Sequence, residues 1–176
     1  VRFIEKSACA EITSVLKREH PQIKLVGVFV NSPVNEIKDI LQTCHLDLAQ
    51  LHGDETPEIF AQLAPHAFRA FRGIPESNAG YERDEAPTML IDAAVKGVYG
   101  GSGVTAGWAA ATELAKKYPL LLAGGLTPEN VADAVKQVNP WGVDVASGVE
   151  SAPGEKDAEK MSAFVKAVKQ TMDNRQ

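Results

Sequence analysis

Cysteine, basic charge and long apolar runs are all scarce in this sequence. Its 176 residues include two cysteines, and 18 lysine and arginine residues against 23 aspartate and glutamate residues give a net charge of −5. This acidic balance, without any basic run, argues against a nucleic-acid partner. The longest apolar runs are about half as long as a membrane span requires, and nothing at the N-terminus resembles a signal peptide. We therefore expect a cytoplasmic protein with no nucleic-acid partner and no membrane association.

The two cysteines, Cys9 and Cys44, each fall in a predicted helix and lack the spacing of metal ligands. We interpret them as reduced core thiols and predict no metal site. Hydrophobic residues make up 44% of the chain and charged residues 23%, which is typical of a globular protein. A chain of this length can bury one substantial core, so we predict a single domain over residues 1–176.

Apolar runs alternate with amphipathic segments along the whole chain. Buried strands are predicted at residues 24–30, 47–51, 68–71, 88–93, 120–123 and 143–146. Helices are predicted at residues 6–18, 34–43, 57–64, 108–117, 128–138 and 155–171, and the polar segment 73–87 can hold only a short or degraded helix. This strict alternation indicates one parallel α/β domain. Short strands at spacings of about 20–30 residues favour a (β/α)8 TIM barrel, and no G-x-G-x-x-G motif opens the first unit as in dinucleotide-binding folds.

The tripeptide Thr-Pro-Glu occurs twice, at residues 56–58 and 127–129, each time before an apolar-periodic segment. Thr at the N-cap, Pro at the first helical position and an acid in the first turn are typical of a helix start. We therefore predict that a helix begins at each of these sites.

Residues 119–151 are the most informative stretch, because two successive predicted strands each end in a turn of small residues. Gly124-Gly125 follows the first strand and Ser147-Gly148 follows the second. Such turns bring backbone N–H groups to the surface, and in a (β/α)8 barrel the loops after the last two strands form a phosphate site. We predict a phosphate site at these four residues. The alternative is that the glycines only make tight turns between strand and helix.

Polar residues at the C-terminal ends of barrel strands are the candidates for chemistry. Gln50 and His52 stand at the end of the second predicted strand, Asp92 at the end of the fourth, and Asp144 within the last. Asp92 follows Met-Leu-Ile, an apolar setting that favours a protonated carboxyl able to act as a general acid, with helix capping or ion pairing as the alternative. For His52 we keep two interpretations, a donor to phosphate or carboxylate and a residue bonded within its own turn. We interpret Asp144 as structural.

Several segments, taken together and in order, carry a resemblance to a known family. They are residues 50–55 (QLHGDE), 90–92 (LID), 99–103 (YGGSG) with Trp108, 122–131 (LAGGLTPENV) and 142–151 (GVDVASGVES). In this combination the sequence resembles phosphoribosylanthranilate isomerase, a (β/α)8-barrel enzyme of tryptophan biosynthesis, over nearly the whole chain. A sugar-phosphate epimerase or an indoleglycerol-phosphate synthase fits less well, because those families do not show QLHGDE together with GVDV-SGVE.

The resemblance implies an Amadori rearrangement of N-(5′-phosphoribosyl)anthranilate without a cofactor, so the expected partner is a phosphorylated small molecule. It places on Asp92 the general acid that protonates the furanose ring oxygen, and on Arg2 the arginine that holds the anthranilate carboxylate. Gln50 and His52 are expected to contact the substrate as well. The phosphate contacts implied by the family are Gly124, Gly125, Ser147 and Gly148, with Gly101 and Gly103 in the loop above them.

The sequence departs from the family at the general base, which is a cysteine in a Lys-x-Cys-Gly motif on the family's first strand. Neither Cys9 nor Cys44 matches that motif, and the sequence starts at the loop after the family's second strand. We therefore expect an N-terminally incomplete barrel with six visible βα units, little turnover by these residues alone, and a homo-oligomer as one way to cover the open edge. The alternative function is a non-catalytic phosphosugar-binding or assembly module that has lost its base.

Overall fold

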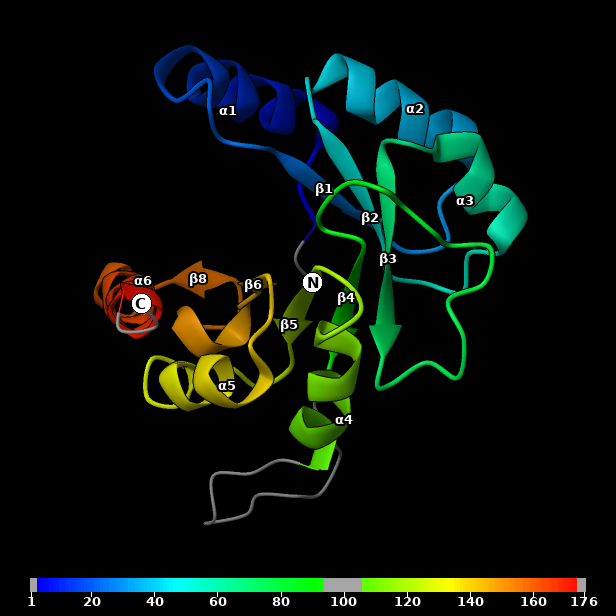
Figure 1. Cartoon of the computed structure of the whole chain (residues 1–176). Helices are drawn as coiled ribbons and strands as arrows, with labels where there is room; N and C mark the ends of the chain where they lie inside the picture. The colour runs from blue at the N-terminus through cyan, green and yellow to red at the C-terminus, as the bar shows by residue number, and fades with distance from the viewer. Residues whose placement is uncertain (1–2, 94–105, 174–176) are drawn as a thin grey trace. The chain divides into compact units, whose positions relative to one another are not determined.

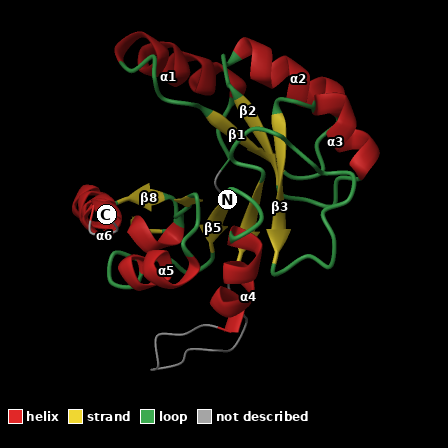
Figure 2. Cartoon of the chain, viewed as in Figure 1, coloured by secondary structure: helices red, strands yellow, loops and turns green. Residues whose placement is uncertain are grey.

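The computed structural model describes residues 3–93 and 106–173. The chain divides into two compact units. The first comprises the described residues up to Ala70 together with Ser77–Asp84, and the second comprises Phe71–Glu76 and the described residues from Glu85 onward. A helix follows each of the strands β1, β2, β4 and β5 along the chain, as Figures 1 and 2 show, which confirms the predicted α/β class.

The first unit contains three parallel strands and three helices, all close to their predicted positions. They are α1 (Lys6–Glu19), β1 (Val26–Phe29), α2 (Val34–Thr43), β2 (Leu48–Leu51), α3 (Pro57–Leu63) and β3 (Ala67–Arg72). β1 pairs with β2 and β2 with β3, always in parallel, so strands that are consecutive in sequence are neighbours. The helices between them supply the crossover connections that parallel pairing requires.

The core of the first unit lies between these strands and their helices. All four residues of β2 are buried, as predicted, and the apolar cluster includes Phe29, Ile37, Leu51 and Phe60. α3 begins as the first Thr-Pro-Glu predicts, with Thr56 at the N-cap and proline at the start of the helix.

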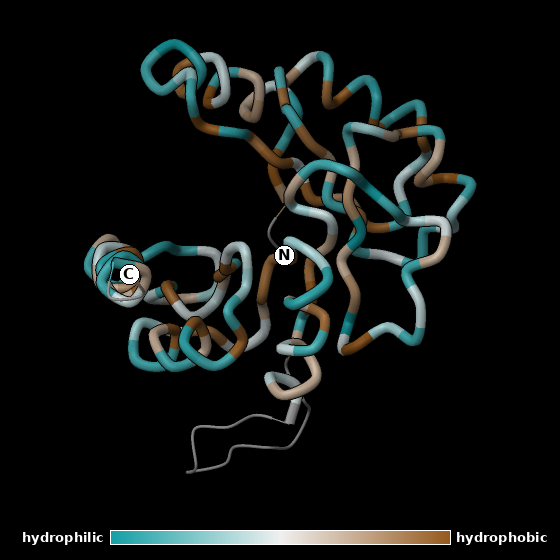
Figure 3. Tube along the Cα trace, in the orientation of Figure 1, coloured by the Kyte–Doolittle hydropathy of each residue, from teal (hydrophilic) through white to brown (hydrophobic). Residues whose placement is uncertain are grey.

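β1 does not form the fully buried strand that was predicted. Phe29 is buried in the core, whereas Val26, Val28 and Val30 are 41%, 61% and 57% exposed. Successive side chains of a strand point to opposite faces, so covering one face with helices leaves the other valines uncovered within this unit. Figure 3 shows hydrophobic colouring along this strand.

Asp47 holds the segments that lead into β1 and β2. Its carboxylate accepts hydrogen bonds from Leu25 N–H at 2.7 Å and from Lys17 Nζ at 2.5 Å, and Lys24 Nζ lies 3.4 Å away. Burial alone would raise the pKa of the Asp47 carboxyl, but the bonds from Lys17 and Leu25 and the charges of the two lysines lower that pKa overall. The ionised carboxylate therefore ties α1 to the start of the sheet.

The second unit starts with the end of β3, and β4 follows β3 without a helix between them. Its further elements are β4 (Met89–Asp92), α4 (Ala106–Ala115), β5 (Leu120–Ala123), α5 (Val131–Val138), β6 (Gly142–Val143), the 3₁₀ turn η1 (Ser147–Val149), β7 (Glu150–Ala152), β8 (Glu155–Lys156) and α6 (Ala158–Asp173). β4, β5 and β6 are parallel and adjacent in that order, and α5 packs against both α4 and α6. β4 and β5 are apolar and mostly buried, as their sequences predict.

Two boundaries in the second unit differ from the predictions. β6 covers only Gly142–Val143, because the chain after Val143 turns into η1 instead of extending as a strand to residue 146. Both residues of β6 are half-buried. α6 begins at Ala158, because Glu155–Lys156 pairs with β7 in an antiparallel hairpin. Residues 73–87, all of them described, contain no helix.

The helix after the second Thr-Pro-Glu begins later than predicted. The Thr127 hydroxyl accepts a hydrogen bond from Glu129 N–H at 3.3 Å, and its carbonyl accepts one from Val131 N–H at 3.0 Å, but the N-cap of α5 is Asn130 and not Thr127. Regular helix begins at Val131, since residues 128–130 form a turn. α5 ends as predicted at Asn139, whose left-handed backbone closes the helix.

The two cysteines lie at one contact between helices. Cys9 is half-buried within α1, whereas Cys44 is fully buried directly after the end of α2, not inside the predicted helix. Cys44 Sγ donates to the carbonyl of Lys6 at 3.5 Å, and burial raises the pKa of the Cys44 thiol. Cys44 is thus a core thiol, as predicted.

Candidate functional site

Asp92 is the last residue of β4, as predicted, and is half-buried. In the sheet register it lies opposite Ala123, the last residue of β5. Ala93 N–H donates to the Ala123 carbonyl at 2.9 Å, so the pairing continues past the end of both strands. The candidate acid therefore stands beside the turn that opens with Gly124.

The turn after β5 has a backbone that only glycine adopts easily. Gly124 and Gly125 have φ angles of 101° and 64°, and a Cβ added to Gly125 would meet no atom within 4 Å. Asn130 closes the turn, because its side-chain amide donates to the Gly125 carbonyl at 2.9 Å and its oxygen accepts Thr127 N–H at 2.8 Å. The two glycines are accessible to solvent.

The turn after β6 packs directly onto the turn after β5. A Cβ on Gly148 would come within 1.8 Å of the Leu126 carbonyl oxygen, so only glycine allows this approach. In the described part of the chain, the backbone N–H groups of Gly125, Ser147 and Gly148 donate no hydrogen bond to another protein group. Backbone N–H groups without a protein acceptor, on two adjacent loops, are suited to binding an anion with several oxygen atoms.

The β7–β8 hairpin supports the second turn, and the sequence analysis did not find it. Lys156 Nζ donates to the Ala146 carbonyl at 2.6 Å and to the Glu150 carboxylate at 3.0 Å. Lys160 Nζ donates to the Glu150 carbonyl at 2.8 Å. Asp144 lies directly after β6, and its N–H donates to the Leu122 carbonyl at 2.8 Å.

In the first unit, Gln50 and His52 lie next to each other at the end of β2. Gln50 Nε2 is 3.0 Å from His52 Nδ1, and His52 N–H donates to the Phe29 carbonyl at 2.9 Å. Because the glutamine amide is the donor, Nδ1 accepts and the proton of a neutral ring lies on Nε2. Gln50 thus sets the tautomer of His52.

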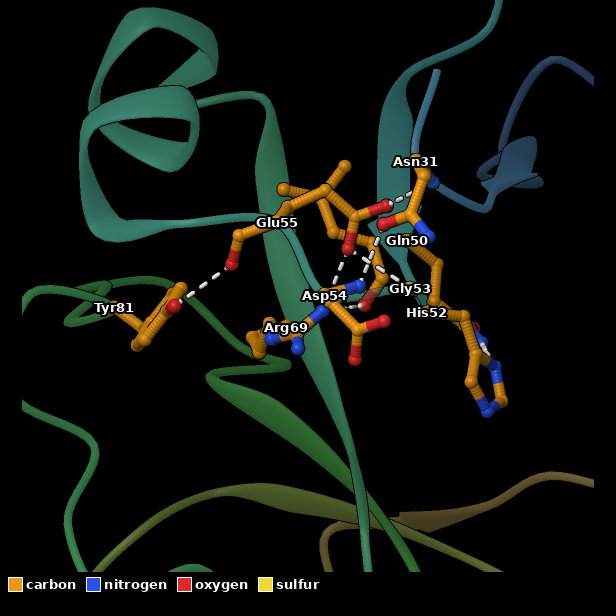
Figure 4. Close-up of polar contacts among 9 residues, drawn as sticks. Asn31, Gln50, His52, Gly53, Asp54, Glu55, Arg69 and Tyr81 are labelled. Atoms are coloured by element: carbon orange, nitrogen blue, oxygen red, sulfur yellow. Dashed lines mark hydrogen bonds and ion pairs between the residues drawn. The ribbon is translucent and has the colours of Figure 1, made fainter.

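A buried carboxylate lies just beyond His52, and the sequence analysis gave it no role. Glu55 is 2% exposed; it accepts hydrogen bonds from Asn31 N–H at 2.7 Å, from Gly53 N–H at 2.9 Å and from Arg69 Nη1 at 2.6 Å. Figure 4 shows these contacts converging from the loops after β1 and β2 and from β3. The signal in the sequence was Arg69, a charge within the apolar strand AFRAFR.

Three predicted site residues, Arg2, Gly101 and Gly103, lie outside the described residues. Among residues 3–93 and 106–173 there is no group of His, Cys, Asp and Glu side chains that could hold a metal ion. No helix in those same ranges is both long and apolar enough to cross a membrane.

The family model described as N-(5′-phosphoribosyl)anthranilate (PRA) isomerase matches residues 4–167. The curated PRA isomerase of Roseiflexus sp. (strain RS-1) is 50% identical over 154 residues, which are 84% of this chain and 71% of the relative. That of Geotalea daltonii is 43% identical over 174 residues, which are 97% of this chain and 82% of the relative.

Two solved structures are similar along most of their length. TrpF from Jonesia denitrificans has a TM-score of 0.79 at 33% identity, covering 98% of this chain and 82% of that one. A phosphoribosyl anthranilate isomerase in complex with reduced 1-(o-carboxyphenylamino)-1-deoxyribulose 5-phosphate has a TM-score of 0.75 at 28% identity, covering 96% of this chain and 81% of that one.

With these matches, the parallel βα units define a fold of the (β/α)8-barrel family, as the sequence predicted. The glycine turns after β5 and β6 fit that class, which binds phosphate at such loops. The chain belongs to the N-(5′-phosphoribosyl)anthranilate isomerase family, the isomerases of tryptophan biosynthesis.

Proposed function

We propose that this chain carries out the family's Amadori rearrangement, using Asp92 as the general acid and the turns after β5 and β6 as the phosphate site. The observation that carries this proposal is the sheet register, which sets Asp92 opposite Ala123, one residue before Gly124-Gly125. A substrate whose phosphate is bound at that turn would present its sugar ring to the neighbouring acid. Asp92 donates its proton to the furanose ring oxygen while the lone pair of the anthranilate nitrogen displaces that oxygen from the anomeric carbon, which leaves a free hydroxyl group and a protonated imine.

The other proposed contacts are divided between binding and orientation. Gln50 and His52 are proposed to contact the substrate, with His52 Nε2–H as the donor because Nδ1 accepts from Gln50. Arg2 is proposed to hold the anthranilate carboxylate, and Gly101 and Gly103 to lie over the phosphate. No step in this scheme requires a cofactor.

We also propose that the chain forms a single domain and that the protein is cytoplasmic. Residues 4–167 match a single family model that runs through both compact units, so we propose that residues 1–176 work as one domain. The free thiols of Cys9 and Cys44 suit a reducing compartment such as the cytoplasm.

The test of this proposal is binding and turnover measured on the same preparation. We expect the chain to bind reduced 1-(o-carboxyphenylamino)-1-deoxyribulose 5-phosphate in calorimetry, and to convert N-(5′-phosphoribosyl)anthranilate once a segment carrying a Lys-x-Cys-Gly motif is supplied as a fusion, because no such motif occurs in these residues. Binding that never leads to turnover would favour the phosphosugar-binding module. A chain that neither binds nor turns over would contradict both functions.

We further propose that the chain self-associates through Val26 and Val28, which are exposed on β1, and Val30, which is exposed directly after it. One neighbour, from Thermotoga maritima, is described as a dimeric PRA isomerase from which monomers were generated. Replacing Val28 with lysine is expected to weaken self-association at least about tenfold in analytical ultracentrifugation, because the charge would have to be buried. The control is Val165→Lys, since Val165 is a similarly exposed valine on α6. A wild-type chain that stays monomeric at every concentration would contradict the proposal.

A further inference from the structure

Glu55 holds the backbone around His52 in place through several hydrogen bonds. It lies three residues after His52 in the loop that follows β2, and its side chain is fully buried. One oxygen accepts Asn31 N–H, and the other accepts both Gly53 N–H and the Arg69 guanidinium, at 2.6–2.9 Å. Its own carbonyl accepts the Tyr81 hydroxyl at 2.7 Å. Both carboxylate oxygens are therefore engaged by the protein, as Figure 4 shows.

These bonds fix the backbone on both sides of the candidate histidine. The N–H of His52 donates to the Phe29 carbonyl in the neighbouring strand, and the next N–H, of Gly53, donates to Glu55. The approach of the two loops is close, since a Cβ on Gly53 would lie 2.4 Å from Asn31 Oδ1 and 2.7 Å from its backbone nitrogen. Asn31 Oδ1 in turn accepts Asp54 N–H at 2.7 Å.

The buried position of Glu55 is better explained by its effect on the positions of the surrounding loops than by a gain in folding stability. A buried ion pair such as Glu55–Arg69 adds little net stability, because the cost of desolvating both charges offsets their attraction. What a carboxylate does here is accept three N–H groups from three chain segments at one point. Arg69 lies on β3 and is itself held over the Tyr81 ring, with 5.5 Å from the guanidinium carbon to the ring centroid.

We propose that Glu55 is a positioning residue for the substrate contact at His52: it orients the imidazole by clamping the loops after β1 and β2, without touching the substrate. This inference rests on the proposed role of His52 in substrate binding. Glu55→Gln keeps the shape of the side chain, but its NH₂ group must then face a donor, either Asn31 N–H or the pair formed by Gly53 N–H and Arg69. The loop on one side of His52 is then released.

The experiment compares three single variants of the full chain, Glu55→Gln, His52→Gln and Glu58→Gln. Glu58 is the matched control, an exposed glutamate three residues further along at the start of α3. Two ligands are titrated by calorimetry, the reduced product analogue carrying the whole skeleton and inorganic phosphate, which probes the glycine turns alone. The imidazole signals of His52, assigned by their loss in His52→Gln, are followed by NMR.

We expect Glu55→Gln to shift the His52 signals and to weaken binding of the product analogue by about tenfold to a hundredfold, as a small misplacement of a contact does. Inorganic phosphate binding should be unchanged, and Glu58→Gln should behave as wild type. Where Glu55→Gln does not fold, Glu55→Asp carries the test, because it keeps the charge and shortens the arm by one methylene group.

Two negative results have different meanings. A folded Glu55 variant with wild-type His52 signals and wild-type affinity for the analogue would overturn the positioning role. A His52→Gln variant with wild-type affinity would instead remove His52 from the substrate site, and with it the proposed function of this pair. Loss of inorganic phosphate binding in Glu55→Gln would also overturn the proposal, since the effect would not then be local to His52.

Discussion

Replacing Asp92 with asparagine is expected to lower kcat by about 10²–10⁴ and to leave KM nearly unchanged, in an isomerase that carries this chain together with a Lys-x-Cys-Gly segment. Asp92 ends β4 opposite Ala123, next to the proposed phosphate turn. Its proton is transferred to the ring oxygen only as the ring opens, so its loss affects the transition state more than the bound substrate. Steady-state kinetics with N-(5′-phosphoribosyl)anthranilate measures both constants.

The control for this variant is Asp144→Asn. Asp144 also follows a strand directly, but it is exposed and its N–H pairs with Leu122, so we expect wild-type kinetics. An Asp92→Asn enzyme that keeps the wild-type kcat would remove this residue from the mechanism. An equal loss of activity in both variants would point to general damage instead.

Replacing Gly148 with alanine is expected to weaken inorganic phosphate binding at least about tenfold, and to lower the free energy of unfolding by about 1–3 kcal/mol. The new Cβ would lie 1.8 Å from the Leu126 carbonyl oxygen, so the two turns must move apart. The N–H groups of Gly125 on one turn and of Gly148 on the other would then be too far apart to bind the proposed anion together. Calorimetry with phosphate and denaturant unfolding measure the two effects.

Gly142→Ala is the matched control for the Gly148 variant. At Gly142 the nearest atom to an added Cβ is the end of the flexible Leu121 side chain, at 2.8 Å, which can rotate away. We expect a small loss of stability and wild-type phosphate affinity. If Gly148→Ala bound phosphate as tightly as wild type, the anion site would have to lie away from these two turns.

The local pattern of the sequence was sufficient for most of the secondary structure. β2, β4 and β5 are short runs of mostly apolar residues, and all three form strands within one or two residues of the predictions. Their character is encoded locally, since a strand covered on both faces needs mostly apolar side chains on each face. The first Thr-Pro-Glu likewise specifies where α3 begins.

Local sequence patterns gave wrong predictions where the result depended on which strands pair or on what packs against a strand. The apolar run of β1 predicted a buried strand, but burial depends on what packs against each face, and Val28 is 61% exposed. Residues 155–156 have a helical pattern, yet they pair with β7 and delay α6 to Ala158. Neither the exposure of Val28 nor the pairing of residues 155–156 could be predicted from the neighbouring residues in the sequence.

By itself, the sequence determined the order of the six parallel strands and of the helices, Asp92 at a strand end and the small residues of both turns, because these depend on residues close together in the chain. Only the tertiary structure decided that Gly148 packs on Leu126 and that Asn31, Glu55 and Arg69 meet around the loop after His52. Those contacts join residues 14–24 positions apart, and the hydrogen bonds among them form only when the strands that position these residues are paired in one register.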